Sequence, residues 1–284
     1  MKNIDTHFFC CYNTTYMKIG IVGHGFVGSA VNQAFIRDVK KFIVDPKYFR
    51  ENSMKDLVRF QPDVTFVCVP TPQSETGECD TELLSKVMMD LNLIKGHLAV
   101  VKSTVPAYKL QSIIDQCIDL KCVLNPEFLT EKNYIKDFQN PAMLLLGGDR
   151  EHTSRVEEIY KKHSVCKSCP VFHTDIVTAS MVKYCINSFL ATKVTFMNEM
   201  YDVLRSAGGA DWREFIRIVS ADNRMGNSHM QVPGKDGMRG YAGSCFPKDT
   251  AALAYFAREI LSKPFTQLET SIRINDALRK INNS

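Results

Sequence analysis

A cysteine near the carboxyl-terminal end of the chain has the neighbours of a reactive thiol. Cys245 lies in the segment GSCFPKD (243–249), where Pro247 favours the start of a helix. A helix N-terminus and an adjacent lysine, Lys248, both favour the thiolate, which is the nucleophilic form of the group. Asp249 follows one helical turn after the cysteine and could orient a base or a water. Most cysteines are small buried groups, but the position of Cys245 favours covalent chemistry.

A lysine and an asparagine share one face of a long predicted helix. Lys183 and Asn187 stand four residues apart within 177–207, where apolar residues recur at helical spacing. A helical lysine is usually solvated, and asparagine is an indifferent helix former. Because this pair shares its face with apolar residues such as Met181 and Ile186, we expect the two polar groups to line a pocket.

A glycine-rich turn between a strand and a helix has the pattern of a dinucleotide site. The strand 17–22 runs into Gly23-His24-Gly25-Phe26-Val27-Gly28, and a helical pattern follows. Gly23 would form the tight turn, Gly25 would let the backbone approach a pyrophosphate, and Gly28 would let the helix pack against the strand. The amides at the helix N-terminus would then bind the phosphates. We expect His24 to point out of the turn and to have no role.

An acidic residue at the end of the second strand completes this pattern. Asp45 stands 22 residues after Gly23. A carboxylate at this place accepts hydrogen bonds from a ribose diol and repels a 2′-phosphate. The sequence therefore predicts NAD, rather than NADP, as the cofactor.

The elements that position these residues alternate between short apolar strands and helices as far as residue 175. Continuous apolar runs, rather than alternating ones, predict strands that are covered on both faces. Strands alternating with helices, such as 27–37 and 81–93, predict a parallel doubly wound sheet. The predicted strands are 17–22, 41–44, 64–69, 98–101, 121–124, 143–146 and 170–173.

The rest of the chain has only helical patterns, over 177–207, 211–220, 248–262 and 264–282, and a glycine-rich loop over 226–243. The predicted fold class is α/β, with an N-terminal Rossmann-type doubly wound parallel sheet followed by an all-helical domain. We expect an NAD-binding domain over 17–176 and a helical substrate and dimerisation domain over 177–284. Residues 1–16 lack the apolar block of a signal peptide and are expected to be a disordered extension, or to precede a true start at Met17.

Length and composition indicate a soluble globular protein. A chain of 284 residues is expected to form about two domains. Thirty-five Lys and Arg against 31 Asp and Glu leave a net charge of +4, too small a surplus to favour nucleic acid or a membrane surface as partner. The sequence has no uninterrupted apolar run of about 18 residues, so it predicts no membrane-spanning helix. Ten cysteines without a secretory signal are expected to be reduced thiols, which predicts a cytoplasmic protein.

Two histidines and two cysteines lie close together before the last predicted strand, at His163, Cys166, Cys169 and His173. The ligand pairs of a zinc site are usually separated by a longer connection, because a short chain cannot wrap around a tetrahedral ion. We therefore predict a surface turn here and no metal, with a structural zinc as the less favoured alternative.

Taken together, six motifs resemble those of the UDP-glucose/GDP-mannose dehydrogenase family, over residues 17–280. In order they are GxGxxG at 23–28, CVPTP at 68–72, KSTVP at 102–106, NPEFLTE at 125–131, the helix 179–199 and GSCFPKD at 243–249. The resemblance implies an enzyme that uses two NAD to oxidise the C6 alcohol of a nucleotide sugar to the carboxylate. UDP-glucose is the expected sugar, with GDP-mannose or a UDP-N-acetylhexosamine as alternatives.

The same resemblance implies a covalent mechanism. Cys245 would capture the C6 aldehyde as a thiohemiacetal, and the second oxidation would give a thioester. Lys183 would stabilise the oxyanion, with Asn187 as its hydrogen-bonding partner. The other implied catalytic residues, which would organise a water or transfer protons, are Asp249, Thr104 and Glu127.

The resemblance also implies two sets of binding residues. The implied cofactor contacts are Gly23, Gly25, Phe26, Val27, Gly28, Asp45, Arg50, Thr71, Ser103, Thr104, Glu131 and Lys248. The implied substrate contacts are Glu127, Phe128, Leu129, Lys183, Asn187, Arg224, Gly240, Tyr241 and Gly243. In the family, the arginine at the position of Arg224 often reaches the site of a neighbouring subunit.

Two features leave alternatives open. Family members normally carry a third domain that binds the base, which needs on the order of 100 further residues, and we expect this chain to lack it. An apolar stripe on 264–282 predicts a homodimer or a higher homo-oligomer. The first hypothesis is an active nucleotide-sugar dehydrogenase. A truncated nucleotide-binding module without turnover is the second, and a β-hydroxyacid dehydrogenase, which needs no thiol nucleophile, is the third.

Overall fold

The structure is a computed structural model that describes residues 16–209 and 211–281. The extension expected at 1–16 therefore lies, apart from Tyr16, outside the described residues. Among the helices of the described part, none is both long and apolar enough to cross a membrane.

Seven strands form one sheet in the order β2-β1-β3-β4-β5-β6-β7. Their bounds are β1 (Met17–Val22), β2 (Val39–Val44), β3 (Val64–Val67), β4 (Leu98–Val101), β5 (Lys121–Leu124), β6 (Leu144–Gly147) and β7 (Val171–Thr174). β3 and β4 are buried at every position, as their continuous apolar runs predict. The predicted Rossmann-type α/β fold is confirmed.

The sheet is mostly parallel, as predicted, with one antiparallel pair that the sequence did not indicate. β5 and β6 meet in antiparallel register, with Leu124 opposite Gly147, whereas β6 and β7 are parallel. A parallel neighbour would require the chain to cross back to the amino end of β5. The chain instead forms a loop and the short helix α5 (Tyr134–Gln139) at the carboxyl end, and β6 starts from there.

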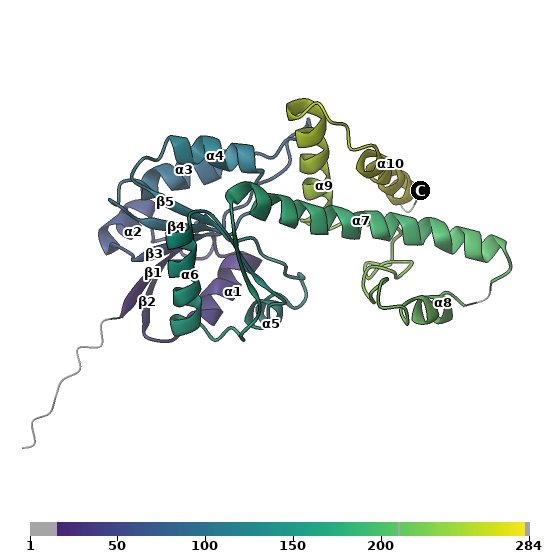
Figure 1. Ribbon diagram of the computed structural model, residues 1–284, viewed down its shortest axis with the longest axis horizontal. Helices are drawn as coiled ribbons and strands as arrows, with labels where there is room; N and C mark the ends of the chain where they lie inside the picture. Colours follow the sequence, from purple (N-terminus) through teal and green to yellow (C-terminus); the bar gives the residue numbers. More distant parts are fainter. Residues whose placement is uncertain (1–15, 210, 282–284) are drawn as a thin grey trace, which may run out of the picture.

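Helices cover both faces of the sheet (Figure 1). The helices on one face are α1 (Phe26–Ala34), α5 and α6 (Arg150–His163), and those on the other are α2 (Met54–Phe60), α3 (Glu82–Leu91) and α4 (Ala107–Asp115). Phe35 and Phe66 are fully buried on the first face, and Leu57 and Met88 on the second. Burial of large apolar side chains on both faces holds the strand ends, and the loops that leave them, in fixed places.

A single long helix, α7 (Ile176–Ser206), runs from the sheet to the far end of the molecule (Figure 1). Asp175 caps it, since its carboxylate accepts a hydrogen bond of 2.8 Å from the Thr178 amide. The helices that follow are α8 (Trp212–Val219), α9 (Phe246–Tyr255) and α10 (Thr266–Ile281). α9 and α10 both pack against α7.

The helix predicted over 248–262 differs from the observed one at both ends. α9 begins at Phe246, with Pro247 in its first turn, and continues into a turn of π-helix at Phe256–Ile260. The helix ends with this wider turn at Ile260. Pro264 follows, and a proline disfavours helical conformation in the residue before it. The early start leaves Cys245 at the position that caps α9.

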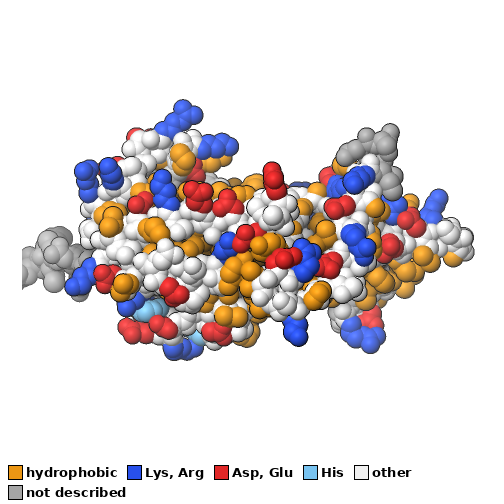
Figure 2. Space-filling model, turned by 90° about the horizontal axis from the view of Figure 1, so that it is seen from above, with side chains coloured by type: hydrophobic (Ala, Val, Ile, Leu, Met, Phe, Trp, Pro, Cys, Tyr) orange, Lys and Arg blue, Asp and Glu red, His pale blue; other side chains and the backbone are white. Residues whose placement is uncertain are grey.

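Charged side chains of both signs are interspersed on the surface. On the face shown in Figure 2, Lys and Arg lie among Asp and Glu rather than in one basic patch. This distribution agrees with the small net charge of +4, and it does not favour a polyanion as partner on that face.

Close packing between β6 and the start of α7 gives a test of how the long helix is held. A Cβ on Gly147 would lie 2.5 Å from Ala179 Cβ and 2.9 Å from the backbone oxygen of Asp175. We expect Gly147→Ala to lower the free energy of unfolding by about 1–3 kcal/mol, because strand or helix must shift. Urea denaturation followed by circular dichroism measures this change.

Gly25→Ala is the matched control, since a Cβ on Gly25 meets no atom within 4 Å. Its unfolding free energy is expected to stay within about 0.5 kcal/mol of the wild type. If Gly147→Ala is as stable as this control, α7 does not pack against β6 as closely as described.

Candidate active site

A cavity of about 550 Å³ opens at the carboxyl ends of the first strands. In a doubly wound sheet this edge is the usual place for a ligand. The cavity extends from the glycine turn after β1 to the start of α9. Its predicted lining residues are Gly23, Gly25, Phe26, Val27, Asp45, Thr71, Ser103, Thr104, Glu127, Leu129, Glu131, Cys245 and Lys248.

The glycine turn has the geometry that its sequence predicts. Gly23 has a φ of +87°, and a Cβ there would lie 2.6 Å from the Cys68 backbone oxygen. A Cβ on Gly28 would lie 1.9 Å from the Gly23 oxygen, so only glycine lets α1 start this close to β1. Gly25 faces open space. The turn therefore presents backbone directly to the cavity, as binding of a pyrophosphate requires.

Asp45 lies at the end of β2 and is nine-tenths buried. Its carboxylate accepts a hydrogen bond of 2.6 Å from the His24 amide, and further ones from the amides of Lys47 and Tyr48. Burial opposes the charge, but these amides hold the pKa of Asp45 below its usual value. The carboxylate is therefore ionised and fixed at the mouth of the glycine turn. Thus His24, expected to be without a role, orients Asp45 through its backbone.

Arg50 is placed differently from the other predicted cofactor contacts. It is exposed and lies outside the cavity lining. The residues of the same turn that do line the cavity are Lys47 and Tyr48. The Asp45 carboxylate turns the chain sharply after β2, and this turn brings the nearer side chains inward. Asp45 followed closely by a lysine and a tyrosine was the signal available in the sequence.

Cys245 caps α9 and lines the cavity, half-buried. Contrary to expectation, burial raises the pKa of its thiol above the usual value. The contact with Ser244 and the charge of Lys183 lower this pKa, whereas the carboxylates of Glu127 and Asp249 raise it. The expectation that the helix N-terminus would favour the thiolate was wrong, because the sequence does not show how far the sulfur is buried.

Lys183 is almost fully buried and binds the loop that follows β5. Its Nζ donates to the Glu127 backbone oxygen at 2.6 Å and to Glu127 Oε1 at 3.2 Å. It also lies 5.3 Å from the centre of the Phe128 ring. The ammonium is thus fixed near the sulfur of Cys245, as an oxyanion-stabilising group would be.

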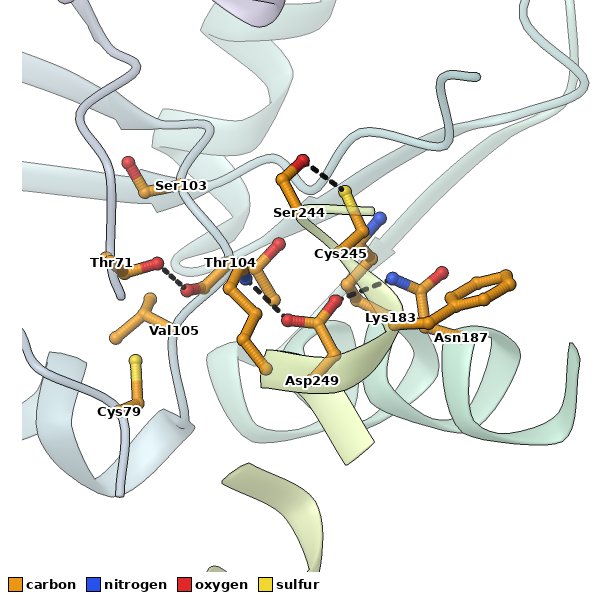
Figure 3. A network of polar contacts seen from close by, with 12 residues as sticks. Thr71, Cys79, Ser103, Thr104, Val105, Lys183, Asn187, Ser244, Cys245 and Asp249 are labelled. Carbon is orange, nitrogen blue, oxygen red and sulfur yellow. Dashed lines mark hydrogen bonds and ion pairs between the residues drawn. The ribbon is translucent and has the colours of Figure 1, made fainter. Parts of the chain in front are cut away.

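Asn187 contacts Asp249 rather than Lys183. Its Nδ2 donates to Asp249 Oδ2 at 2.6 Å (Figure 3), and Lys248 Nζ donates to Asp249 Oδ1. Asp249 is 1% exposed, so this carboxylate needs both donors. The i, i+4 spacing on α7 put Lys183 and Asn187 on one face, but neither is among the residues that line the cavity, contrary to expectation. Their partners come from two other segments.

Hydroxyl groups hold together the two loops that follow β3 and β4. Thr71 Oγ1 donates to the Thr104 backbone oxygen at 2.7 Å (Figure 3). Ser103 Oγ donates to the Val69 oxygen at 2.6 Å. All three predicted residues line the cavity. The side chains of Thr71 and Ser103 bond the loops, and contact of any of the three residues with a ligand remains a prediction.

A buried lysine that the sequence interpretation missed also lines the cavity. Lys102 Nζ donates to Asn125 Oδ1 at 3.0 Å, and the Tyr160 hydroxyl donates to the same oxygen at 2.7 Å. Burial lowers the pKa of Lys102 to about 8. The lysine fixes the start of the loop that carries Glu127. Its place in the motif KSTVP was the signal that could have identified it.

Ser244 is a second residue that was missed, although it is next to Cys245. Its hydroxyl donates to Glu131 Oε1 at 2.8 Å and lies 3.7 Å from the Cys245 sulfur. This contact joins the loop after β5 to the turn before α9. The two residues are 113 positions apart, so no spacing rule could have paired them.

The predicted substrate residues of the loop 226–243 lie away from the cavity lining. Tyr241 is buried, and its amide and the backbone of Gly240 are held by Asn275 and Arg279 of α10. Arg224 is exposed and pairs with Asp222. Gly243 adjoins Glu131 at the edge of the site. The role of Arg224 in a neighbouring subunit's site remains a prediction.

The histidines and cysteines between 163 and 173 have separate partners. His163 contacts the Arg37 backbone oxygen, the Cys166 thiol donates to the Phe138 oxygen, and His173 contacts Glu157. In the part of the chain that the structure describes, no three such side chains are grouped so that they could hold a metal ion.

Comparison with known proteins assigns both halves of the chain to one family. Residues 37–164 match the NAD-binding domain of the UDP-glucose/GDP-mannose dehydrogenase family, and residues 177–277 match its central domain. A UDP-glucose dehydrogenase from Pyrobaculum islandicum has a similar structure, with a TM-score of 0.79 and 25% identity. The similarity covers 94% of this chain and 69% of that one.

Two relatives from Bacillus subtilis strain 168 show how far the similarity extends. UDP-glucose 6-dehydrogenase TuaD is 32% identical over 85% of this chain and 52% of its own length. YtcA is 32% identical over 92% of this chain and 68% of its own length. The chain thus spans about half the length of most of the curated relatives it matches. With both domain models and these relatives in agreement, the chain belongs to the UDP-glucose/GDP-mannose dehydrogenase family and contains its NAD-binding domain.

Proposed function

We propose that this chain is an NAD-dependent nucleotide-sugar 6-dehydrogenase that oxidises UDP-glucose to UDP-glucuronate. The observation that carries this proposal is that Cys245 and the glycine turn line the same cavity. A thiol beside a nicotinamide site allows an aldehyde to be held covalently between two oxidations. GDP-mannose and UDP-N-acetylhexosamines are the alternative sugars.

The residues of the cavity fit NAD. The amides after Gly25 would bind the pyrophosphate, and Asp45 would accept hydrogen bonds from the adenine ribose. The negative charge of Asp45 would repel a 2′-phosphate, which favours NAD over NADP. Bound NAD would supply the hydride acceptor for each oxidation.

Cys245 and Lys183 would have separate roles at the reacting carbon, C6 of the sugar. The thiolate of Cys245 would add to the C6 aldehyde, and its sulfur would keep the half-oxidised sugar in the site. The buried ammonium of Lys183 would stabilise the oxyanion that forms in this addition. Its contacts with Glu127 fix it in place, so little reorganisation is needed when the charge develops.

Two carboxylates near the sulfur, those of Glu127 and Asp249, would then activate or orient water molecules. Glu127 lines the cavity beside Lys183, where it could activate the water that hydrolyses the thioester. Asp249, held by Asn187 and Lys248, would orient a water, and we place Thr104 with it.

We also propose a homo-oligomer in a reducing, cytoplasmic compartment. All eight cysteines that the structure describes are free thiols, which supports such a compartment. The apolar stripe of α10, expected to need a partner, is mostly covered within the chain, where Leu268 is 1% and Leu278 8% exposed. An exposed apolar face lies instead on α7, where Phe189, Phe196 and Val203 are more than half exposed at seven-residue intervals. A second copy would cover such a face.

Binding of NAD can be tested at the glycine turn. Because a Cβ on Gly25 would enter open cavity space, Gly25→Ala should block the approach of the pyrophosphate. We expect the dissociation constant for NAD, measured by calorimetry, to rise about tenfold or more, equivalent to about 1.4 kcal/mol. The unchanged stability of this variant separates lost binding from unfolding. Undiminished NAD affinity would place the cofactor elsewhere.

Turnover can be tested at the sulfur. Wild-type protein should form two NADH per UDP-glucose, and Cys245→Ser should lower the rate on the order of 10³-fold, because the aldehyde is no longer held by a thiol. Absorbance of NADH and mass detection of the acid measure both. Cys185→Ser, which removes an exposed thiol on α7, is the matched control and should keep wild-type activity.

Other outcomes of the same assay favour the other hypotheses. NAD binding without NADH formation from any UDP- or GDP-sugar would indicate a binding module. One NADH per substrate, with full activity after alkylation of Cys245, would indicate a hydroxyacid dehydrogenase. A different nucleotide sugar consumed with the same stoichiometry would correct only the substrate.

A further inference from the structure

In the part of the chain that the structure describes, the two lysines near the half-buried thiol of Cys245 are both paired with other groups. Lys183 Nζ binds the backbone and the carboxylate of Glu127, and Lys248 Nζ binds Asp249. The carboxylates of both pairs oppose a charge on the sulfur, and burial already raises the pKa of the thiol. The nucleophile therefore needs a group that removes its proton as it attacks.

A hydroxyl group lies between this sulfur and a carboxylate. Ser244 Oγ is 3.7 Å from Cys245 Sγ and 2.8 Å from Glu131 Oε1, and the Ser244 amide also donates to that oxygen. Figure 3 shows the serine directed toward the sulfur. Gly243, with a φ of +85°, forms the turn that brings them together, and a Cβ there would lie 3.4 Å from Glu131 Oε1.

The sulfur, the hydroxyl and the carboxylate lead from a half-buried position to the solvent-exposed surface of the cavity. Cys245 is half-buried, whereas Ser244 and Glu131 are exposed, and all three line the cavity. A serine hydroxyl donates one hydrogen bond and accepts others, so it can pass a proton between two partners. Because the Ser244 hydroxyl donates its hydrogen to Glu131, the Cys245 thiol is the donor in its contact with Ser244.

We propose that Ser244 and Glu131 form a proton path by which the Cys245 thiol loses its proton during attack. This proposal rests on the proposed role of Cys245 as nucleophile. Ser244 touches the reacting sulfur, and Glu131 is the positioning residue that aims the hydroxyl and accepts the proton beyond it.

The step balances without any redox partner. The S–H bond of Cys245 breaks, and its proton moves to Ser244 Oγ. The Ser244 O–H bond breaks at the same time, its proton moves to Glu131 Oε1, and the electron pair of the S–H bond remains on the sulfur for attack. Glu131, now a carboxylic acid at the exposed end of the path, releases the proton to water.

Alkylation of Cys245 tests the path without requiring turnover. The cofactor-free protein is treated with iodoacetamide over a pH series, and peptide mass spectrometry gives the rate at Cys245, with the exposed Cys185 as internal reference. Below the midpoint of the pH profile, we expect Ser244→Ala to react on the order of tenfold more slowly than wild type. Above it, where the thiolate forms without help, the two should converge.

Glu131→Gln distinguishes a proton path from a simple charge effect. The amide keeps a hydrogen bond to Ser244 but cannot accept a proton, so a path predicts slower alkylation below the midpoint. A charge effect predicts the opposite, because loss of a nearby negative charge favours the thiolate. Faster alkylation of Glu131→Gln would therefore overturn the proposal.

Two further variants control for structure. Ser244→Thr keeps the hydroxyl and should retain the wild-type profile. Ser220→Ala removes a hydroxyl that bonds to Ile216 at the end of α8 and should leave the profile unchanged. An unchanged profile for Ser244→Ala would also overturn the path. If the profiles change as expected but no nucleotide sugar is oxidised, the proton path stands and the proposed function is wrong.

Discussion

The contact between Lys183 and Glu127 is the constraint on which the site depends. It joins the long helix α7 to the loop after β5, and its two side chains are only 4% and 10% exposed. A buried ion pair is worth little as a source of stability, but removing one partner leaves an uncompensated charge at a cost of about 3–5 kcal/mol. The two segments therefore cannot separate locally, and the position of the sheet edge relative to the helical region is fixed where the chemistry would take place.

This constraint explains why the thiol is surrounded by charge and is nevertheless not strongly activated. Lys183 and Lys248 are each paired with a carboxylate, and Glu131 lies beyond Ser244, so these ammonium groups do little to stabilise a thiolate. A permanent thiolate would react with any electrophile that entered the cavity, whereas a thiol that loses its proton only on attack would not. Cys68 is the example of an unreactive thiol in the same cavity, because burial raises its pKa to about 12.

Much of the fold could be predicted because its signals are local. Continuous apolar runs marked every strand to within about two residues, and Pro247 marked the start of α9. The antiparallel meeting of β5 and β6 could not be predicted, because it depends on which end of the sheet the chain returns to. The positions of Lys183 and Asn187 on one helix face followed from their spacing. Their partners, Glu127 and Asp249, come from distant segments and are revealed only by the folded structure.

The candidate site also has a part formed by neighbouring residues in the sequence and a part formed by distant segments. The glycine turn and Asp45 lie within 22 residues, so backbone geometry alone brings them together. Cys245 reaches them from 200 residues further along the chain, through the docking of α7 against β6 and of α9 against α7. A displacement of about 1 Å between a nucleophile and its target can cost on the order of 10²-fold in rate. Close packing at Gly147, remote from the cavity, is therefore as much a condition for chemistry at the sulfur as the groups that touch it.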